Sequence, residues 1–165
     1  MTTTTDKIAY AATNAITITL NSLASAAASG RSCAAVDNTT NLYDDALVYV
    51  QVAVLTGLAN DKSVYVYFYG SEDGTNYNNS TAQEVNVGSD LVTGIDSPTS
   101  LKGPAVIPIV ANSKTFKGVF NVAAFFGGVM PRKWGVVIQN YAGAAFSGTP
   151  SDHVVSYTGI TYTNS

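Results

Sequence analysis

The chain has 165 residues, which suits a single domain with a buried core, and a net charge of −3. Charged residues make up only 12 % of it, about half the usual share, so uncharged polar residues must cover the surface or partners must bury part of it. Because binding to phosphates needs clustered Lys and Arg, this composition argues against a nucleic-acid partner.

Residues that support catalysis or metal binding are scarce. His153 is the only histidine and Cys33 the only cysteine, which excludes an intrachain disulfide and argues against a zinc site. Ser151 and Asp152 precede His153, but residues adjacent in sequence do not by themselves build a catalytic triad. We therefore expect no enzymatic activity, no metal and no cofactor, and we interpret Cys33 as a small buried hydrophobe.

Segments in which apolar and polar residues alternate recur along the chain and predict β-strands. In chain order these segments are 15–20, 46–55, 63–69, 105–110, 114–122, 134–140 and 153–163. Two other stretches have helical features: 20–30, rich in Ala and Leu, is either a short helix or a loop, and the chain allows a helical turn around 122–126. The acidic stretch 37–41 predicts a turn whose side chains bond their own backbone.

These elements predict an all-β protein with at most one short helix, folded as an antiparallel β-sandwich of the jelly-roll type with long loops. Residues 15–165 form the single sandwich domain, and residues 1–14 form a flexible N-terminal arm or a frayed terminus. More than thirty residues, rich in Asn, Ser, Thr, Asp and Gly with few apolar anchors, separate Gly70 from Lys102 and predict one of the long loops. No apolar run approaches the ~20 residues that span a bilayer, and MTTTTDK lacks the basic region of an export signal.

The stretch SVYVYFYGSEDGTNY, 63–77, combines an aromatic strand with a turn. Its valines and Phe68 are predicted to face the core, and its alternate tyrosines to face outward. Asp73-Gly74 predicts a hairpin turn, after which a return strand begins. Outward tyrosines suit ordinary sheet packing, a protein interface or stacking on a sugar, and the residues leave these three uses open.

Three groups of residues are candidates for protein contacts. The arm could add backbone hydrogen bonds to the edge of a neighbouring sheet, the outward tyrosines suit an interface, and the loop before 134–140 gathers apolar side chains that either make contacts or close the end of the core. The candidates are Ile8 and Tyr10 in the arm, Tyr65, Tyr67 and Tyr69 in the strand, and Phe125, Phe126 and Met130 around the loop.

Three segments, SLASAAASGRSCAAVDNTTNLYDDALVYVQVAV, VYFYGSEDGTNY and KWGVVIQNYAGAAF, together resemble small jelly-roll structural proteins of tailed bacteriophages, most closely the cement or capsid decoration type. The resemblance covers roughly residues 15–163. It implies a homotrimer, made in the host cytoplasm, that sits on the capsid exterior and clamps neighbouring subunits of the major capsid protein without enzymatic activity. Tail and fibre proteins have similar patterns, so a glycan-binding tail or fibre component is the alternative.

Overall fold

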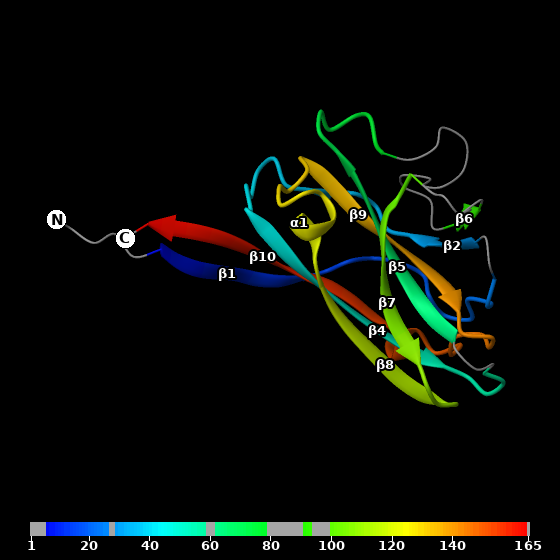
Figure 1. Cartoon of the computed structure of the whole chain (residues 1–165). Coiled ribbons are helices and arrows are strands. Elements are labelled where there is room, and N and C mark those ends of the chain that lie inside the picture. Colours follow the sequence, from blue (N-terminus) through cyan, green and yellow to red (C-terminus); the bar gives the residue numbers. More distant parts are fainter. Residues whose placement is uncertain (1–5, 27–28, 59–61, 79–90, 94–99, 165) are drawn as a thin grey trace.

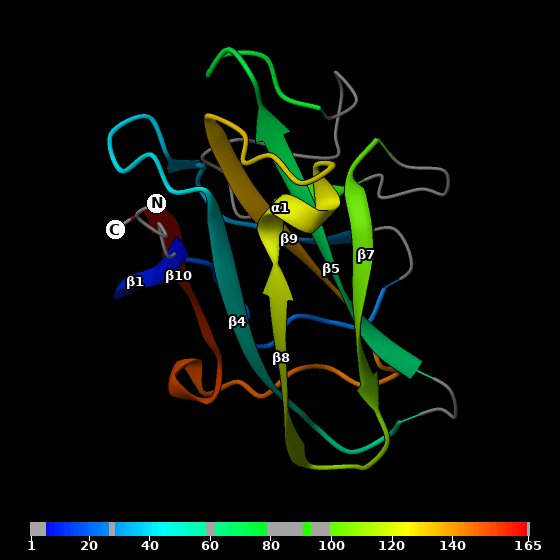
Figure 2. The same ribbon diagram turned by 60° about the vertical axis from the view of Figure 1, so that its left-hand side comes forward.

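The computed structural model describes residues 6–26, 29–58, 62–78, 91–93 and 100–164. Within these ranges the chain is nearly all β, and two antiparallel sheets pack face to face as a sandwich (Figures 1 and 2). This confirms the predicted sandwich, while the jelly-roll connectivity stays a prediction.

The first sheet has four strands in the order β1-β10-β4-β8, all antiparallel. Its strands are β1 (Asp6–Ala15), β4 (Asp45–Val54), β8 (Lys114–Asn121) and β10 (Val154–Asn164). The alternation in β4 places the valines at 48, 50, 52 and 54 in the core, as predicted. β4 therefore carries the centre of this half of the core.

The second sheet has the order β6-β2-β9-β5-β7, and β3 also pairs with β9. Its strands are β2 (Ser29–Ser32), β3 (Val36–Asp37), β5 (Lys62–Ser71), β6 (Leu91–Thr93), β7 (Lys102–Ile109) and β9 (Lys133–Tyr141). β9 supplies the largest fully buried side chain, Trp134, whose ring packs edge to face with Tyr157 from the other sheet, with ring centroids 5.4 Å apart. The two sheets are thus joined by an aromatic contact as well as by aliphatic packing.

The helical part of the described residues is small. Helix α1 (Val122–Phe125) follows β8, as the predicted turn around 122–126 required, and a 3₁₀ turn (Pro150–Asp152) precedes β10. Residues 20–26 form no helix, which decides for the loop there, and Ser29 and Gly30 belong to strand β2. Among the residues that the structure describes, no helix has the length and apolar character needed to cross a membrane.

The prediction of a strand at 15–20 is wrong, although the alternation in this segment correctly indicates which of its side chains are buried. β1 ends at Ala15, and after Ile16 donates its N–H to the Val155 carbonyl at 2.8 Å the chain leaves the sheet. Ile16 and Leu20 still point into the core. The period-two pattern thus indicates which side chains are buried. It does not determine whether the backbone of the segment pairs with another strand.

The predicted arm differs from the structure in most of its length. Residues 6–15 form β1, which pairs with β10 over its whole length with one irregularity between Tyr10 and Thr13, and residues 1–5 lie outside the described residues. β4 accompanies β10 only as far as Ile160, so the far ends of β1 and β10 continue as two strands alone. We call residues 6–10 and 160–164 the terminal ribbon, which projects from the sandwich (Figure 1).

Candidate protein-contact surfaces

Tyr69, predicted to face outward, is fully buried. Its hydroxyl donates a hydrogen bond to the Cys33 carbonyl at 2.7 Å, and its ring leaves no space for a Cβ at Gly135 on the neighbouring strand. Tyr77 covers the other side, with ring centroids 5.7 Å apart. Burial is the main reason that the pKa of Tyr69 lies far above its usual value. Tyr69 is therefore structural and is unavailable to a partner.

Tyr67 is also buried, contrary to the prediction, whereas Tyr65 is half exposed. The Tyr67 hydroxyl donates to the Gln139 side chain at 3.3 Å, and burial, assisted by Tyr65, raises its pKa. Tyr65 stacks on Tyr141 at 6.0 Å, and the Lys62 ammonium lies 4.2 Å from the centroid of the Tyr141 ring. The prediction failed because the outer face of this sheet is covered along β5 and β9, where Tyr77 and the segment around Cys33 pack on it, so that only Tyr65 of the three remains open to contact.

The Asp73-Gly74 turn exists, but among the described residues that follow it directly, up to Asn78, no return strand pairs with β5. Gly74 has φ +82°, and the Asp73 carboxylate accepts the backbone N–H of Thr75 at 2.8 Å and of Asn76 at 2.7 Å. β5 pairs instead with β7 and β9, strands that lie further along the chain. The turn is therefore closed by its own side chains rather than by a hairpin ladder.

These hydrogen bonds hold the pKa of Asp73 well below its usual range, chiefly through the backbone N–H groups of Asn76 and Thr75. The stabilisation is present above the ordinary aspartate pKa of ~3.9 and is lost as the pH falls through the lowered value. The Asn76 amide also donates to the Asp73 carboxylate, so the two side chains hold each other at the turn. Because Tyr67 and Tyr69 are buried, these two tyrosines offer no exposed ring on which a sugar could stack beside the turn.

His153 and Cys33 have structural surroundings. The His153 Nδ1 accepts the Ala53 N–H at 3.4 Å, which leaves Nε2 to donate to the Ser147 carbonyl at 3.0 Å. The Asp152 carboxylate accepts the Ser147 hydroxyl at 2.6 Å rather than orienting the imidazole. Cys33 is buried, as predicted. Within the described ranges, no three His, Cys, Asp or Glu side chains lie together as a metal site requires.

The turn at 37–43 is held by its own side chains, as predicted. The Asp37 carboxylate accepts the Thr39 N–H at 2.8 Å and the Thr39 hydroxyl at 2.6 Å, and these bonds are the main reason that its pKa is lowered. The Asn38 amide bonds both backbone groups of Tyr43. The acidic residue thus shapes a loop and does not mark a cation site.

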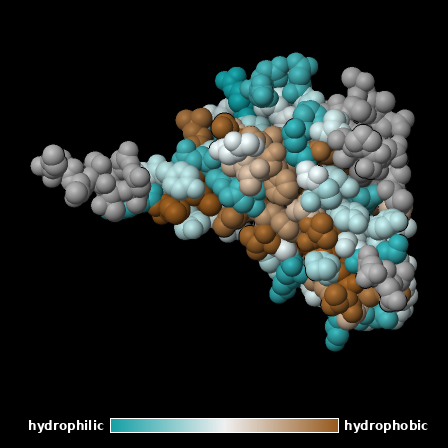
Figure 3. Space-filling model, in the orientation of Figure 1, coloured by the Kyte–Doolittle hydropathy of each residue, from teal (hydrophilic) through white to brown (hydrophobic). Residues whose placement is uncertain are grey.

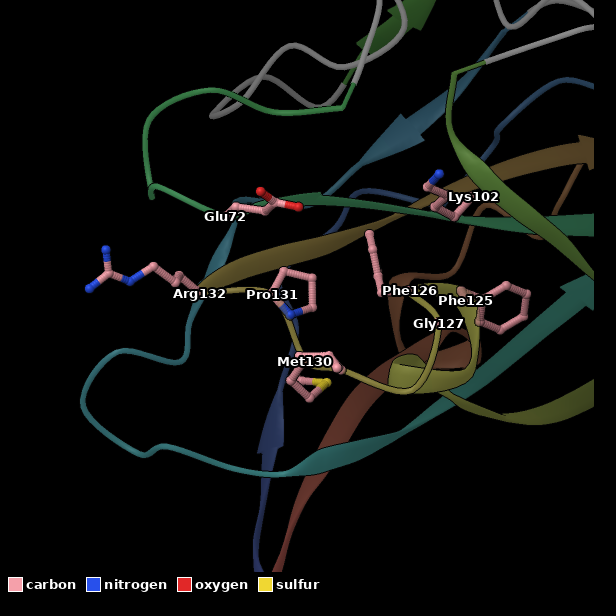
Figure 4. A pocket seen from close by; sticks show the side chains of 9 residues that line it. Glu72, Lys102, Phe125, Phe126, Gly127, Met130, Pro131 and Arg132 are labelled. Carbon is pink, nitrogen blue, oxygen red and sulfur yellow. The ribbon is translucent and has the colours of Figure 1, made fainter.

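A pocket of about 500 Å³ lies beside α1 at one end of the sandwich (Figure 4), and we call it the end pocket. Its apolar surface comes from Phe125, Phe126, Val129, Met130 and Pro131, and charged side chains at its rim come from Glu72, Lys102 and Arg132. Phe125 stacks on the buried Phe68 at 4.5 Å. The three candidates therefore close the end of the core and also line a pocket, while their contact with another protein stays a prediction.

Buried polar groups fix α1 and thereby the end pocket. The Asn121 side chain caps the helix by accepting the Ala124 N–H at 2.9 Å, and the buried Asp45 carboxylate accepts the Ala123 N–H at 2.9 Å. Gly127 and Gly128 then adopt positive φ values that end the helix. The loop that carries Met130 is thus placed by the end of β8 and the start of β4.

The terminal ribbon exposes large apolar side chains on one face. Ile8 and Tyr162 are cross-strand partners, and Tyr10 follows Ile8 by two residues, so the three share that face. Their exposed fractions are 55 % for Ile8, 63 % for Tyr10 and 57 % for Tyr162, and apolar surface on the ribbon is visible in Figure 3. Sequence reasoning named the first two and missed Tyr162, although the alternation in 153–163 extends to it.

The outer face of the four-stranded sheet is nearly free of charge. The register places alternate residues of its four strands on this face, and the charged residues among them are Lys117, which is exposed, and Asp45, which is buried at the end of β4. Below the terminal ribbon the residues are Thr13, Ala15, Asp45, Leu47, Tyr49, Gln51, Ala53, Thr115, Lys117, Val119, Asn121, Val154, Ser156 and Thr158. A sheet face open to water normally carries more charge than this. We call it the uncharged face.

Comparison of the chain with protein-family models, with curated proteins and with solved structures gives no match. The resemblance to phage structural proteins therefore rests only on the segments quoted above.

Proposed function

We propose that this protein is a virion structural protein, a cement or decoration protein that binds the outside of a phage capsid and clamps neighbouring subunits of the major capsid protein. The uncharged face carries the proposal. It is broad, it is built on regular strands, and its Val119 side chain is 60 % exposed. Loss of charge at the centre of a contact patch is typical of protein interfaces.

Clamping needs no catalytic group and no deep site. A homotrimer presents several copies of the same face, so that modest contacts to adjacent capsid subunits add through high effective concentration. The low charge of the whole chain is consistent with surface that becomes covered in the assembled particle. The protein would be made in the host cytoplasm and act on the capsid exterior.

The Val119→Glu variant should bind capsids at least about tenfold more weakly than the wild type, because a carboxylate would have to be buried in an apolar contact. Cosedimentation with capsids stripped of this protein measures the loss. Val106→Glu is the matched control, since Val106 is also exposed but lies on β7 of the other sheet. Equal binding by both variants, or density for the chain only at the tail in a cryo-electron map of the particle, would contradict the proposal.

The alternative is a glycan-binding tail or fibre component, and the described residues offer one aromatic surface on which to test it. Tyr65 and Tyr141 form the half-exposed aromatic pair on β5 and β9, next to Lys62. A glycan array, combined with quenching of tyrosine and Trp134 fluorescence by a bound sugar, tests this surface. A flat response in both measurements would remove the alternative.

A further inference from the structure

We propose that the terminal ribbon of one chain inserts its exposed apolar side chains into the end pocket of a second copy of this chain. The inference deepens the proposed function and rests on it, because it names the contact that joins the copies of the decoration protein. Its test uses the purified protein without capsids, so that its failure and the failure of capsid binding can be told apart.

The ribbon requires a cover that its own chain does not supply among the described residues. A two-stranded β-ribbon is marginally stable by itself in water, and this ribbon continues past the last residue that β4 pairs with. Its exposed face nevertheless carries Ile8, Tyr10 and Tyr162 side by side. Grouped large apolar side chains on a projecting element mark a contact site.

The end pocket has the complementary shape and chemistry. Its volume of about 500 Å³ lies within the ~300–1,000 Å³ of pockets that bury ligands. Phe126 and Met130 offer an aromatic and a thioether surface, which suit contact with another aromatic ring. Val129 at its edge is exposed and leaves the pocket open to an entering element.

The charges around the two surfaces are also complementary. Lys7 is exposed on the ribbon, on the face opposite to Ile8, and Glu72 lies at the pocket rim, exposed and without an ion pair among the described residues. Figure 4 shows Arg132 pointing away from the apolar part of the pocket and Lys102 on the opposite side of it from Glu72. When the apolar face of the ribbon enters the pocket, Lys7 therefore stays outside it at the rim, where Glu72 supplies the opposite charge.

The second copy is the occupant because the ribbon and the end pocket of one chain do not meet. In Figure 1 the ribbon tip projects away from α1, beside which the pocket lies. Because the terminal ribbon and the end pocket lie at different places on the chain, their contact between two copies is heterologous. Such a contact closes into a ring when the rotation between copies allows it. Every copy then both gives a ribbon and receives one.

Two variants separate the halves of this contact. In the ribbon variant, Ile8→Thr and Tyr162→Thr remove the apolar side chains but keep residues that favour strands. In the pocket variant, Val129→Lys places a charge at the exposed edge of the pocket, where the apolar side chains of the ribbon would enter. Val110→Thr is the control, because Val110 is exposed in the turn between β7 and β8. Circular dichroism and thermal unfolding verify that each variant folds.

Light scattering after size exclusion is expected to find an oligomer for the wild type and for Val110→Thr, and monomers for the ribbon and pocket variants. Mixing the two variants in equal amounts should then give a dimer, because the intact ribbon of the pocket variant fits the intact pocket of the ribbon variant. That dimer cannot grow, since its remaining ribbon and pocket are both impaired. Two variants that had merely lost stability would not restore each other.

A monomeric wild type at about 100 μM would overturn the inference, since that concentration lies well above the micromolar affinity expected of a specific contact. Variants that stay oligomeric, or a mixture that stays monomeric, would also overturn it. If the ribbon variant keeps the wild-type mass but loses capsid binding, the ribbon contacts the capsid and the inference is wrong while the proposed function stands. If assembly behaves as expected but no form binds capsids, only the proposed function fails.

Discussion

Replacing Tyr69 with serine should lower the free energy of unfolding by about 3–5 kcal/mol, the cost usually seen when a large aromatic side chain is removed from a core. The ring is fully buried between Gly135 and Tyr77, so its removal leaves a cavity. The change also takes away the hydrogen bond to the buried Cys33 carbonyl. Because a domain of this size is stable by only ~5–15 kcal/mol, the variant should be close to unfolding at 37 °C.

Denaturant unfolding followed by the fluorescence of Trp134 measures this loss. Tyr65→Ser is the matched control, since it removes the same side chain from the same strand where the ring is half exposed, and it should cost only about 1 kcal/mol. Tyr69→Phe keeps the ring and isolates the hydrogen bond, with an expected loss of ~1–3 kcal/mol. Similar losses for Tyr65→Ser and Tyr69→Ser would mean that the outer side of β5 is not covered as described.

The three tyrosines show which part of the fold could be predicted from sequence. Alternation correctly put Val64, Val66 and Phe68 on one side of β5, because neighbouring residues of a strand point to opposite faces. It could not tell whether the opposite face met water. That depended on Tyr77, which folds back onto β5 after the Asp73-Gly74 turn, and on the segment around Cys33, which is distant in the sequence.

The candidate surfaces were predictable only in part, for a similar reason. The alternation in 114–122 and 153–163 gave the strands of the uncharged face, but the face appears only when the register aligns them beside β4. The end pocket combines Glu72, Lys102 and the segment around α1, which are far apart in sequence. β1 was missed because it pairs with residues at the other end of the chain.

Asp45→Ala should be the second most damaging substitution, costing about 3 kcal/mol of stability. Asp45 is buried, and its carboxylate accepts the backbone N–H of Ala46 at 2.7 Å and of Ala123 at 2.9 Å, together with the amide of Asn121. Hydrogen bonds to a charged group are worth ~1.5–3 kcal/mol, and their removal leaves buried donors without an acceptor. Thermal and denaturant unfolding measure the change.

Asp45→Asn is the informative control. The side-chain oxygen of the new asparagine can still accept the N–H groups of Ala46 and Ala123, but its NH₂ group faces the NH₂ group of Asn121, and two donors form no hydrogen bond. It should therefore lose about half as much stability as Asp45→Ala. The two variants also connect the fold to the proposed assembly, since Asp45 holds the start of α1 and α1 holds the pocket residue Phe125. If the ribbon enters the end pocket, Asp45→Ala should weaken self-association at temperatures where the sandwich is still folded. Unchanged assembly together with reduced stability would mean that α1 does not shape the contact.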